Sequence, residues 1–155
     1  MGMPTVDEIK KFLDEYGWRY RLAAKDDNQA LLSSYTLEDD KHGILICYRI
    51  VGEFVMVSTM GIFKDVPADK ASWFLELNDE VKLVKFFSIA GKNPDRLDIE
   101  LGFELWQESW NKETFFAFMD MLCLAIDTTM KKVKERDLPH KTDYVTFEDD
   151  LKTKS

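Results

Sequence analysis

The residues of this sequence that most often take part in catalysis are scattered rather than clustered. It has two histidines, His42 in a predicted turn and His140 near the C-terminal end. Neither stands at a ligand spacing from cysteine, aspartate or glutamate, and a structural zinc site needs about four such ligands. We therefore expect no metal site and no metal cofactor.

The two cysteines, Cys47 and Cys123, are both flanked by apolar residues. A catalytic cysteine needs an accessible thiol in electropositive surroundings, with a base nearby. Apolar neighbours are typical instead of thiols that pack in a core. We expect both cysteines to be buried free thiols.

Carboxylates are abundant, but only one cluster of them stands beside a histidine. The acidic turn at residues 38–40 precedes His42, and this pair leaves open the hypothesis of an unrecognised hydrolase. The other acidic clusters lack the alternating ligands of a calcium loop, and the glycines form no phosphate-binding motif. The sequence therefore predicts a protein that is not an enzyme, with no catalytic residues and no cofactor.

Large apolar side chains that do not fit one core face are the remaining candidates for function. Methionine and tryptophan are favoured at adaptable binding surfaces, so these residues could form a groove for amphipathic peptides. The alternative is a second small core or a dimer contact. The residues predicted as partner or dimer contacts are Met56, Met60, Trp106 and Trp110, with Trp73 a further residue of this kind.

Composition limits the class of partner. The 155 residues are 45% hydrophobic and carry a formal net charge of −8, which fits one folded domain and argues against nucleic acid, because phosphate binding needs clustered lysine and arginine. No signal peptide or membrane-spanning stretch is evident. We therefore expect a cytoplasmic protein with polypeptide partners, no nucleic acid and no membrane contact.

The elements that must position these residues follow from periodicity and capping signals. Thr5 and Glu8 form a capping box at the start of the first helix, and apolar residues recur at helical spacing to the end of the last one. The predicted order is α-β-β-β-β-α-β-β-α, with helices at 5–16, 65–78 and 112–134 and strands at 18–24, 30–37, 44–51, 54–63, 81–91 and 96–106.

Hairpin-linked strands with few helices predict an α+β fold, an antiparallel sheet with helices on one face. The strands at 44–51 and 54–63 are apolar on both faces, so something else must cover the second face. A homodimer is the commonest solution. We expect a single domain over residues 1–136 and a loose acidic tail over 137–155.

One strand ends in a residue that breaks its pattern. "RLDIELGFELW", residues 96–106, alternates apolar and polar side chains, and Trp106 then falls on the polar side. Together with Trp110, it would either clamp the start of the long helix or extend the second sheet face toward a partner. We favour the clamp.

The stretch "WFLELNDEVKLVKFFSIAGKNPDRLDIELGFELW" also carries a resemblance. It has a helix ending in "LELN", a strand with "KFF", a short turn and an alternating strand before the last helix. With this element order, the chain resembles the YbjN-like family of proposed bacterial sensory transduction regulators, which have a type III secretion chaperone-like fold. The resemblance spans about residues 5–134.

This resemblance implies a small α+β domain, frequent homodimers and a role in binding or regulation, and it supplies no catalytic residues. Our first hypothesis is therefore a non-enzymatic protein-binding or regulatory homodimer, to which a chaperone-like role would extend by analogy of fold. The alternative is a small-molecule sensor with an apolar pocket between the sheet and the C-terminal helix.

Overall fold

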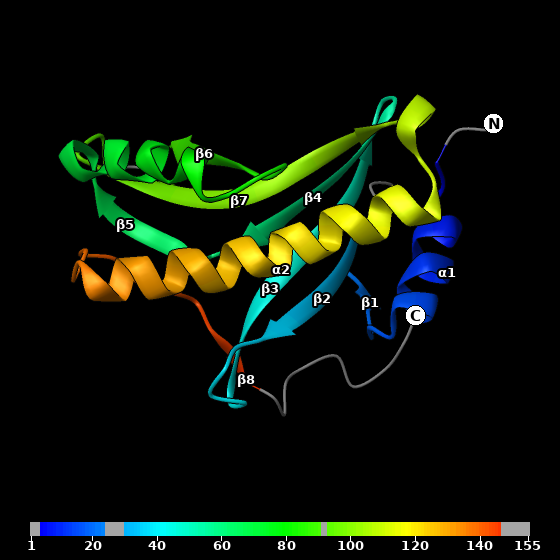
Figure 1. Cartoon of the computed structure of the whole chain (residues 1–155), viewed down its shortest axis with the longest axis horizontal. Coiled ribbons are helices and arrows are strands. Elements are labelled where there is room, and N and C mark those ends of the chain that lie inside the picture. The colour runs from blue at the N-terminus through cyan, green and yellow to red at the C-terminus, as the bar shows by residue number, and fades with distance from the viewer. Residues whose placement is uncertain (1–3, 24–29, 91–92, 147–155) are drawn as a thin grey trace.

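The structure is a computed structural model that describes residues 4–23, 30–90 and 93–146. A long helix crosses one face of a twisted antiparallel sheet, and a shorter N-terminal helix lies beside its beginning (Figure 1). This arrangement confirms the predicted α+β class. The described strands are β1 (Arg21–Leu22), β2 (Ala30–Thr36), β3 (His42–Val51), β4 (Phe54–Met60), β5 (Phe63–Pro67), β6 (Lys85–Ala90), β7 (Arg96–Trp106) and β8 (Val145–Thr146).

The helices follow the expected caps, with one change of type. α1 (Val6–Tyr16) begins with the Thr5–Glu8 capping box and ends at Gly17 in the left-handed conformation. The helix expected at 65–78 begins later, at Ala68, because β5 takes up the residues before it, and it is the 3-10 helix η1 (Ala68–Asp79). After the short η2 (Gln107–Ser109), α2 (Lys112–Glu135) is capped by Asn111, whose side-chain oxygen accepts the Thr114 N–H.

The sheet is ordered β1-β2-β3-β4-β7, and β6 forms its other edge beyond β7. β4 pairs with β7 over residues 54–58 and 102–106, and β5 pairs with the earlier part of the same strand. β4 and β5 therefore lie end to end along one side of β7.

Gly61 separates β4 from β5, where we expected one continuous strand. Its φ of 72° is in the left-handed region that glycine adopts without strain. Beside this break, the Thr59 hydroxyl accepts the Leu101 N–H at 3.1 Å and replaces a missing backbone acceptor. The bend re-aims the chain and permits β5 to follow the twist of β7.

One continuous core fills the space between the sheet and the helices. It is built from the alternate side chains of each strand and from the apolar stripes of α1, η1 and α2. Every helix with core residues packs on this same sheet face. Its fully buried members include Ile9, Leu13, Ile44, Ile46, Tyr48, Val55, Phe63, Leu101, Phe115, Met119, Leu122 and Ile126.

The segment after α2 differs from the loose tail that we expected from residue 137. Leu138 is buried, the Thr142 hydroxyl donates to the Ile62 carbonyl at 2.8 Å, and Val145 pairs with Gly43 in β8. Because β4 bends away at Gly61, a gap opens between β5 and β3, and this segment fills it. The expectation fails here because hydrogen bonds, which leave no apolar pattern, hold the segment. Residues 147–155 of the predicted tail lie outside the described part of the chain.

Within the described residues, no helix has the length and apolar character needed to cross a membrane.

Candidate functional site

The candidate site is the sheet face opposite the helices, here called the outer face. On its three long strands, the side chains are those that alternate with the core positions: Leu45, Cys47, Arg49 and Val51 of β3, Phe54, Met56, Ser58 and Met60 of β4, and Asp98, Glu100, Gly102, Glu104 and Trp106 of β7. None of the described helices packs on it. Both faces of β3 and β4 carry apolar side chains, as predicted. The helices cover the core face of these strands.

An apolar row crosses the end of the outer face. The register places Val51 opposite Phe54, and Phe54 opposite Trp106. These three side chains are 47%, 43% and 46% exposed, respectively, which leaves about half of each in solvent. Such a contiguous group of large side chains is typical of an interaction surface rather than of single scattered hydrophobic residues.

A second apolar pair extends this surface along the two central strands. Met60 is 42% exposed and lies opposite the half-buried Leu45. Met56 is also half-buried and lies on the same face of β4, four residues before Met60. Three of the four predicted contact residues, Met56, Met60 and Trp106, therefore share the outer face.

Trp110, the fourth of these residues, lies on the other side of the sheet. It is 5% exposed, and its ring centroid is 5.0 Å from that of Phe12 and 5.4 Å from that of Phe115. Of the two tryptophans, Trp110 contacts both α1 and the start of α2, and none of the described ring contacts involves Trp106. The favoured clamp of both tryptophans is therefore replaced by one core tryptophan and one surface tryptophan, separated by η2.

Charged side chains surround the apolar residues of the outer face. Lys85 pairs with Glu104 at 2.8 Å, and the Trp106 indole N–H donates to Glu53 at 3.4 Å. Burial raises the pKa of Glu100, although its carboxylate accepts the Gly61 N–H. The outer face thus has an apolar row at one end and an apolar pair further along β3 and β4, with charged side chains between and beside them.

The acidic turn beside His42 has a structural explanation. One Asp39 oxygen accepts the backbone N–H groups of Lys41 and His42, both at 2.9 Å, and the other lies 2.6 Å from the His42 ring. These hydrogen bonds hold the pKa of Asp39 well below its usual range. The carboxylate closes the β2–β3 turn, a role that aspartate commonly has.

The two thiols are free, with Cys47 buried and Cys123 half-buried. Burial raises the pKa of Cys47, and burial with the nearby Asp127 and Asp120 raises that of Cys123 to about 12. A thiol of this kind is a poor nucleophile near neutral pH. Across residues 4–23, 30–90 and 93–146, no group of three or more metal-ligating side chains comes together.

Among the described residues, η1 borders hollows that the sequence analysis did not connect with a site. One, of about 490 Å³, is apolar and lies between η1 and the strands β6 and β7, with Leu75 and Phe86 in its lining. Side chains of the sheet and α2 belong to one core cluster, and the pocket expected between them stays a prediction. Only the exposed Leu75 in "WFLEL" could have pointed to this hollow, and the pattern alone does not separate it from a core residue.

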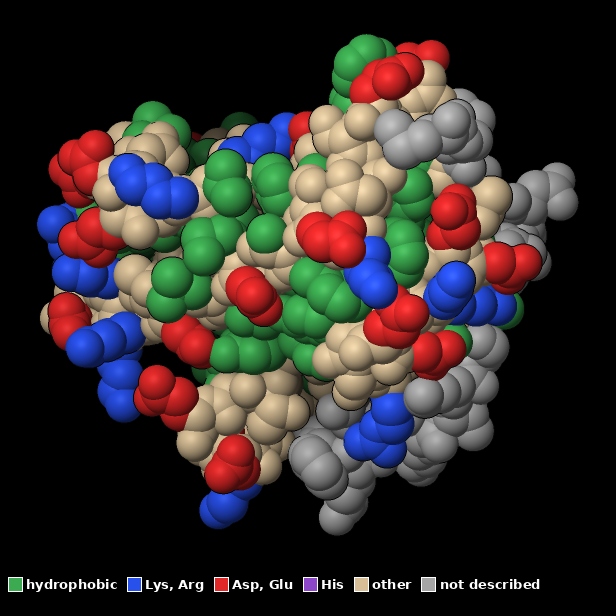
Figure 2. Space-filling view, turned by 45° about the vertical axis from the view of Figure 1, so that its right-hand side comes forward, with side chains coloured by type: hydrophobic (Ala, Val, Ile, Leu, Met, Phe, Trp, Pro, Cys, Tyr) green, Lys and Arg blue, Asp and Glu red, His purple; other side chains and the backbone are tan. Residues whose placement is uncertain are grey.

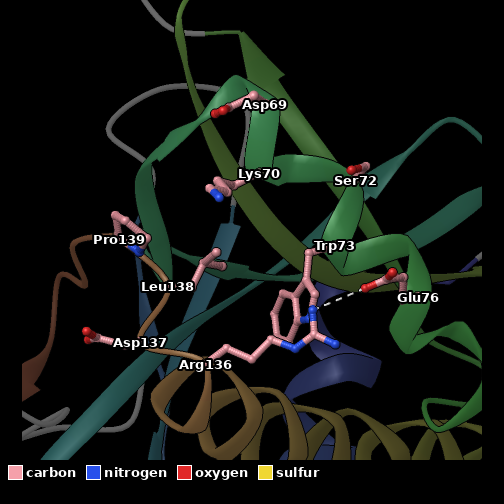
Figure 3. Close-up of a pocket in the computed structure, with 9 residues that line it drawn as sticks. All are labelled: Asp69, Lys70, Ser72, Trp73, Glu76, Arg136, Asp137, Leu138 and Pro139. Atoms are coloured by element: carbon pink, nitrogen blue, oxygen red, sulfur yellow. Dashed lines mark hydrogen bonds and ion pairs between the residues drawn. The ribbon is translucent and has the colours of Figure 1, made fainter.

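The other hollow, of about 330 Å³, lies between η1 and the chain that follows α2. The Arg136 guanidinium stands 5.0 Å from the centroid of the Trp73 ring and 3.3 Å from a Glu76 oxygen (Figure 3). Lys70 and Asp69 also line it. Because charged side chains of both signs line this hollow, water solvates it well. The contact between the Trp73 ring and Arg136 holds η1 against the end of α2.

The comparisons with known proteins concern the fold. No protein-family model and no curated protein matches the sequence. The crystal structure of E. coli YbjN, a proposed transcription regulator, aligns with a TM-score of 0.65 over 90% of this chain and 97% of its own, at 16% identity. This chain has a YbjN-like fold. An uncharacterized protein from Methanothermobacter thermautotrophicus aligns with a TM-score of 0.50 over 84% of this chain and 96% of its own, at 19% identity.

The YbjN-like fold agrees with the resemblance drawn from residues 73–106. In the structure this stretch is η1, β6 and β7, which form one edge of the sheet and the helix above it. At these identities the likeness shows the fold alone. The role of the outer face must therefore be argued from this chain's own residues.

Proposed function

We propose that this chain is a non-enzymatic, protein-binding regulatory domain that acts as a homodimer through its outer face. The row Val51, Phe54 and Trp106 is the observation that carries this proposal, because three large apolar side chains stand half-exposed in register. A two-fold axis over the row would place the same residues of two copies against each other, as an isologous interface requires.

Burial of these side chains would contribute a favourable free energy to association. Full burial of one large apolar side chain is worth about 1.5–3 kcal/mol, and four such side chains, the row and Met60, are each close to half-exposed. Their burial would contribute roughly 3–6 kcal/mol per copy by the same scale. A standard interface removes about 800 Å² from each partner, which the outer face of three long strands can supply.

A regulatory role for this domain would act through protein contacts. YbjN is described as a proposed transcription regulator, but the net charge of −8 on this chain opposes direct contact with DNA phosphates. An acidic surface favours basic or amphipathic polypeptide partners instead. A chaperone-like role would be one form of such binding, and the dimer would present two copies of each partner surface.

Light scattering coupled to size exclusion tests the proposed interface. Phe54→Asp places a charge in the apolar row and should convert a dimer into a monomer. Leu124→Asp is the matched control, because Leu124 is 56% exposed but lies on α2, on the helix-bearing side. On that side, exposed hydrophobic groups are interrupted by acidic side chains (Figure 2). Equal masses for the two variants would contradict the proposal.

A further inference from the structure

β6 is an unprotected edge of the sheet. It pairs with β7 along one side, and no described strand pairs with the other. Edge strands of native proteins are usually shielded by charges, prolines or bulges, because their free N–H and C=O groups pair with other chains. The sequence "KFFSIA" contains one charged residue, Lys85 at its start, and Ile89 is 43% exposed. This edge is therefore open to another extended backbone.

An apolar groove lies directly beside this edge. The hollow of about 490 Å³ between η1 and β6 is lined by Phe74, Phe86, Leu97 and Ile99, and the exposed Leu75 lies at its rim. The Phe74 and Phe86 rings, 5.8 Å apart, connect the two elements. The volume falls in the range of binding pockets and would hold side chains rather than a whole helix.

We propose that the β6 edge and this groove bind an extended segment of a partner polypeptide. The partner backbone would add a strand to β6, and its alternate apolar side chains would enter the groove between η1 and β6. This inference deepens the proposed protein-binding function and rests on it. The polar side of such a segment would be basic, because this chain carries a net charge of −8.

A second copy of this chain fits the groove less well than another polypeptide does. If two β6 strands paired about a two-fold axis, the groove of each copy would receive the side chains of β6 from the other copy. Of these, Phe86 already packs against Phe74 of its own chain, and Ser88 is polar. A symmetric pair would therefore leave the apolar lining unfilled, whereas a segment with alternating apolar residues would fill it.

The probe is a fluorescein-labelled peptide, KVTVKVTVK, which places valine on one face of a strand and lysine or threonine on the other. Fluorescence anisotropy at 0.15 M salt should give a Kd in the micromolar range, on the order of 10 μM. The control peptide KVPVKVPVK keeps every valine and lysine but loses two backbone donors, and proline opposes strand pairing. It should bind at least tenfold more weakly.

Two variants of the protein test whether the peptide binds at the groove. Leu75→Lys puts a charge at the groove rim and should weaken KVTVKVTVK binding at least tenfold. Leu124→Lys changes a similarly exposed leucine on α2 and should leave the binding unchanged. Equal affinity for both peptides, or no effect of Leu75→Lys, would overturn the inference. A loss of dimer mass in Leu75→Lys would also overturn it by making β6 a contact between copies.

The dimer proposal is tested separately by Phe54→Asp, which leaves the groove intact. Peptide binding that persists in monomeric Phe54→Asp supports the inference. A dimer that binds neither peptide would refute the inference and leave the outer-face interface standing.

Discussion

Phe54 and Trp106 lie opposite each other on neighbouring antiparallel strands, and both project from the sheet face that none of the described helices covers. The pair closes the end of the outer face, where Val51 continues the row on β3. Cross-strand aromatic pairs stabilise a sheet modestly even when exposed. Their half-exposed rings leave a larger gain for association, which is the basis of the proposed homodimer.

The two tryptophans that flank η2 should respond differently to substitution. Trp110→Ala empties a space between Phe12 and Phe115 and should lower the free energy of unfolding by about 3–5 kcal/mol. Trp106→Gln, at a half-exposed position, should cost less than about 1 kcal/mol and should weaken dimerisation instead. Urea unfolding measures the first effect, and the solution mass measures the second.

Trp110→Phe is the matched control for the core position. Its ring keeps most of the packing and removes an indole N–H that is buried without an acceptor among the described residues. We expect a loss of less than about 1.5 kcal/mol. Equal destabilisation by Trp106→Gln and Trp110→Ala would show that both tryptophans serve the core.

The segment after α2 should stabilise the domain. Truncation after Asp137 removes the buried Leu138 and the hydrogen bond from Thr142 to Ile62, so we expect it to cost about 2 kcal/mol or more. Truncation after Thr146, which keeps the pairing of β8 with β3, is the control. Thermal unfolding of the two shortened chains compares them, and equal melting temperatures would mean that the segment contributes nothing to stability.

The turn closed by Asp39 should lose stability in acid. Its hydrogen bonds from Lys41 and His42 lower its pKa in the folded state, so the carboxylate stabilises the fold above its unfolded pKa of about 3.9. That contribution falls as the pH drops from about 5 through the folded pKa. The stability difference between the wild type and Asp39→Ala should therefore be present at pH 5 and shrink below pH 4. A difference that grows in acid would reverse this sign.

The thiols should resist alkylation in the folded protein. With a pKa of about 12, roughly one Cys123 side chain in 10⁴ is a thiolate at pH 8. Cys47 is buried and its pKa is also raised. Iodoacetamide should therefore modify the native chain at least a hundredfold more slowly than the chain in guanidinium chloride. Rapid native modification, located by mass spectrometry, would point to an activated cysteine and favour an enzymatic role.

The sequence predicts the sheet and its open face well, because both depend on local periodicity. Strands β3 and β4 are apolar at both odd and even positions, and this alone indicates a second covered face. The break at Gly61 is not predictable in this way, because a glycine within an apolar run looks the same whether or not its φ is positive. Residues 138–146 are missed because they are held by hydrogen bonds to Gly61, Ile62 and Lys64.

The candidate site is predicted only in part for a related reason. Met56, Met60 and Trp106 reach the outer face because strand alternation places them there. Trp110 follows η2, and a short 3-10 turn changes the side of the sheet in a way that spacing does not encode. The groove at β6 depends on which strand ends the sheet, and that is a property of long-range pairing.

The mass of the wild-type chain in solution tests the central claim most directly. Sedimentation equilibrium at ~1 to 100 μM should show a species of twice the 18.1 kDa chain mass, in reversible exchange with the monomer. Phe54→Asp should shift that equilibrium toward the monomer at every concentration. A wild-type mass of 18.1 kDa across the whole range would contradict the homodimer and, with it, the role assigned to the outer face.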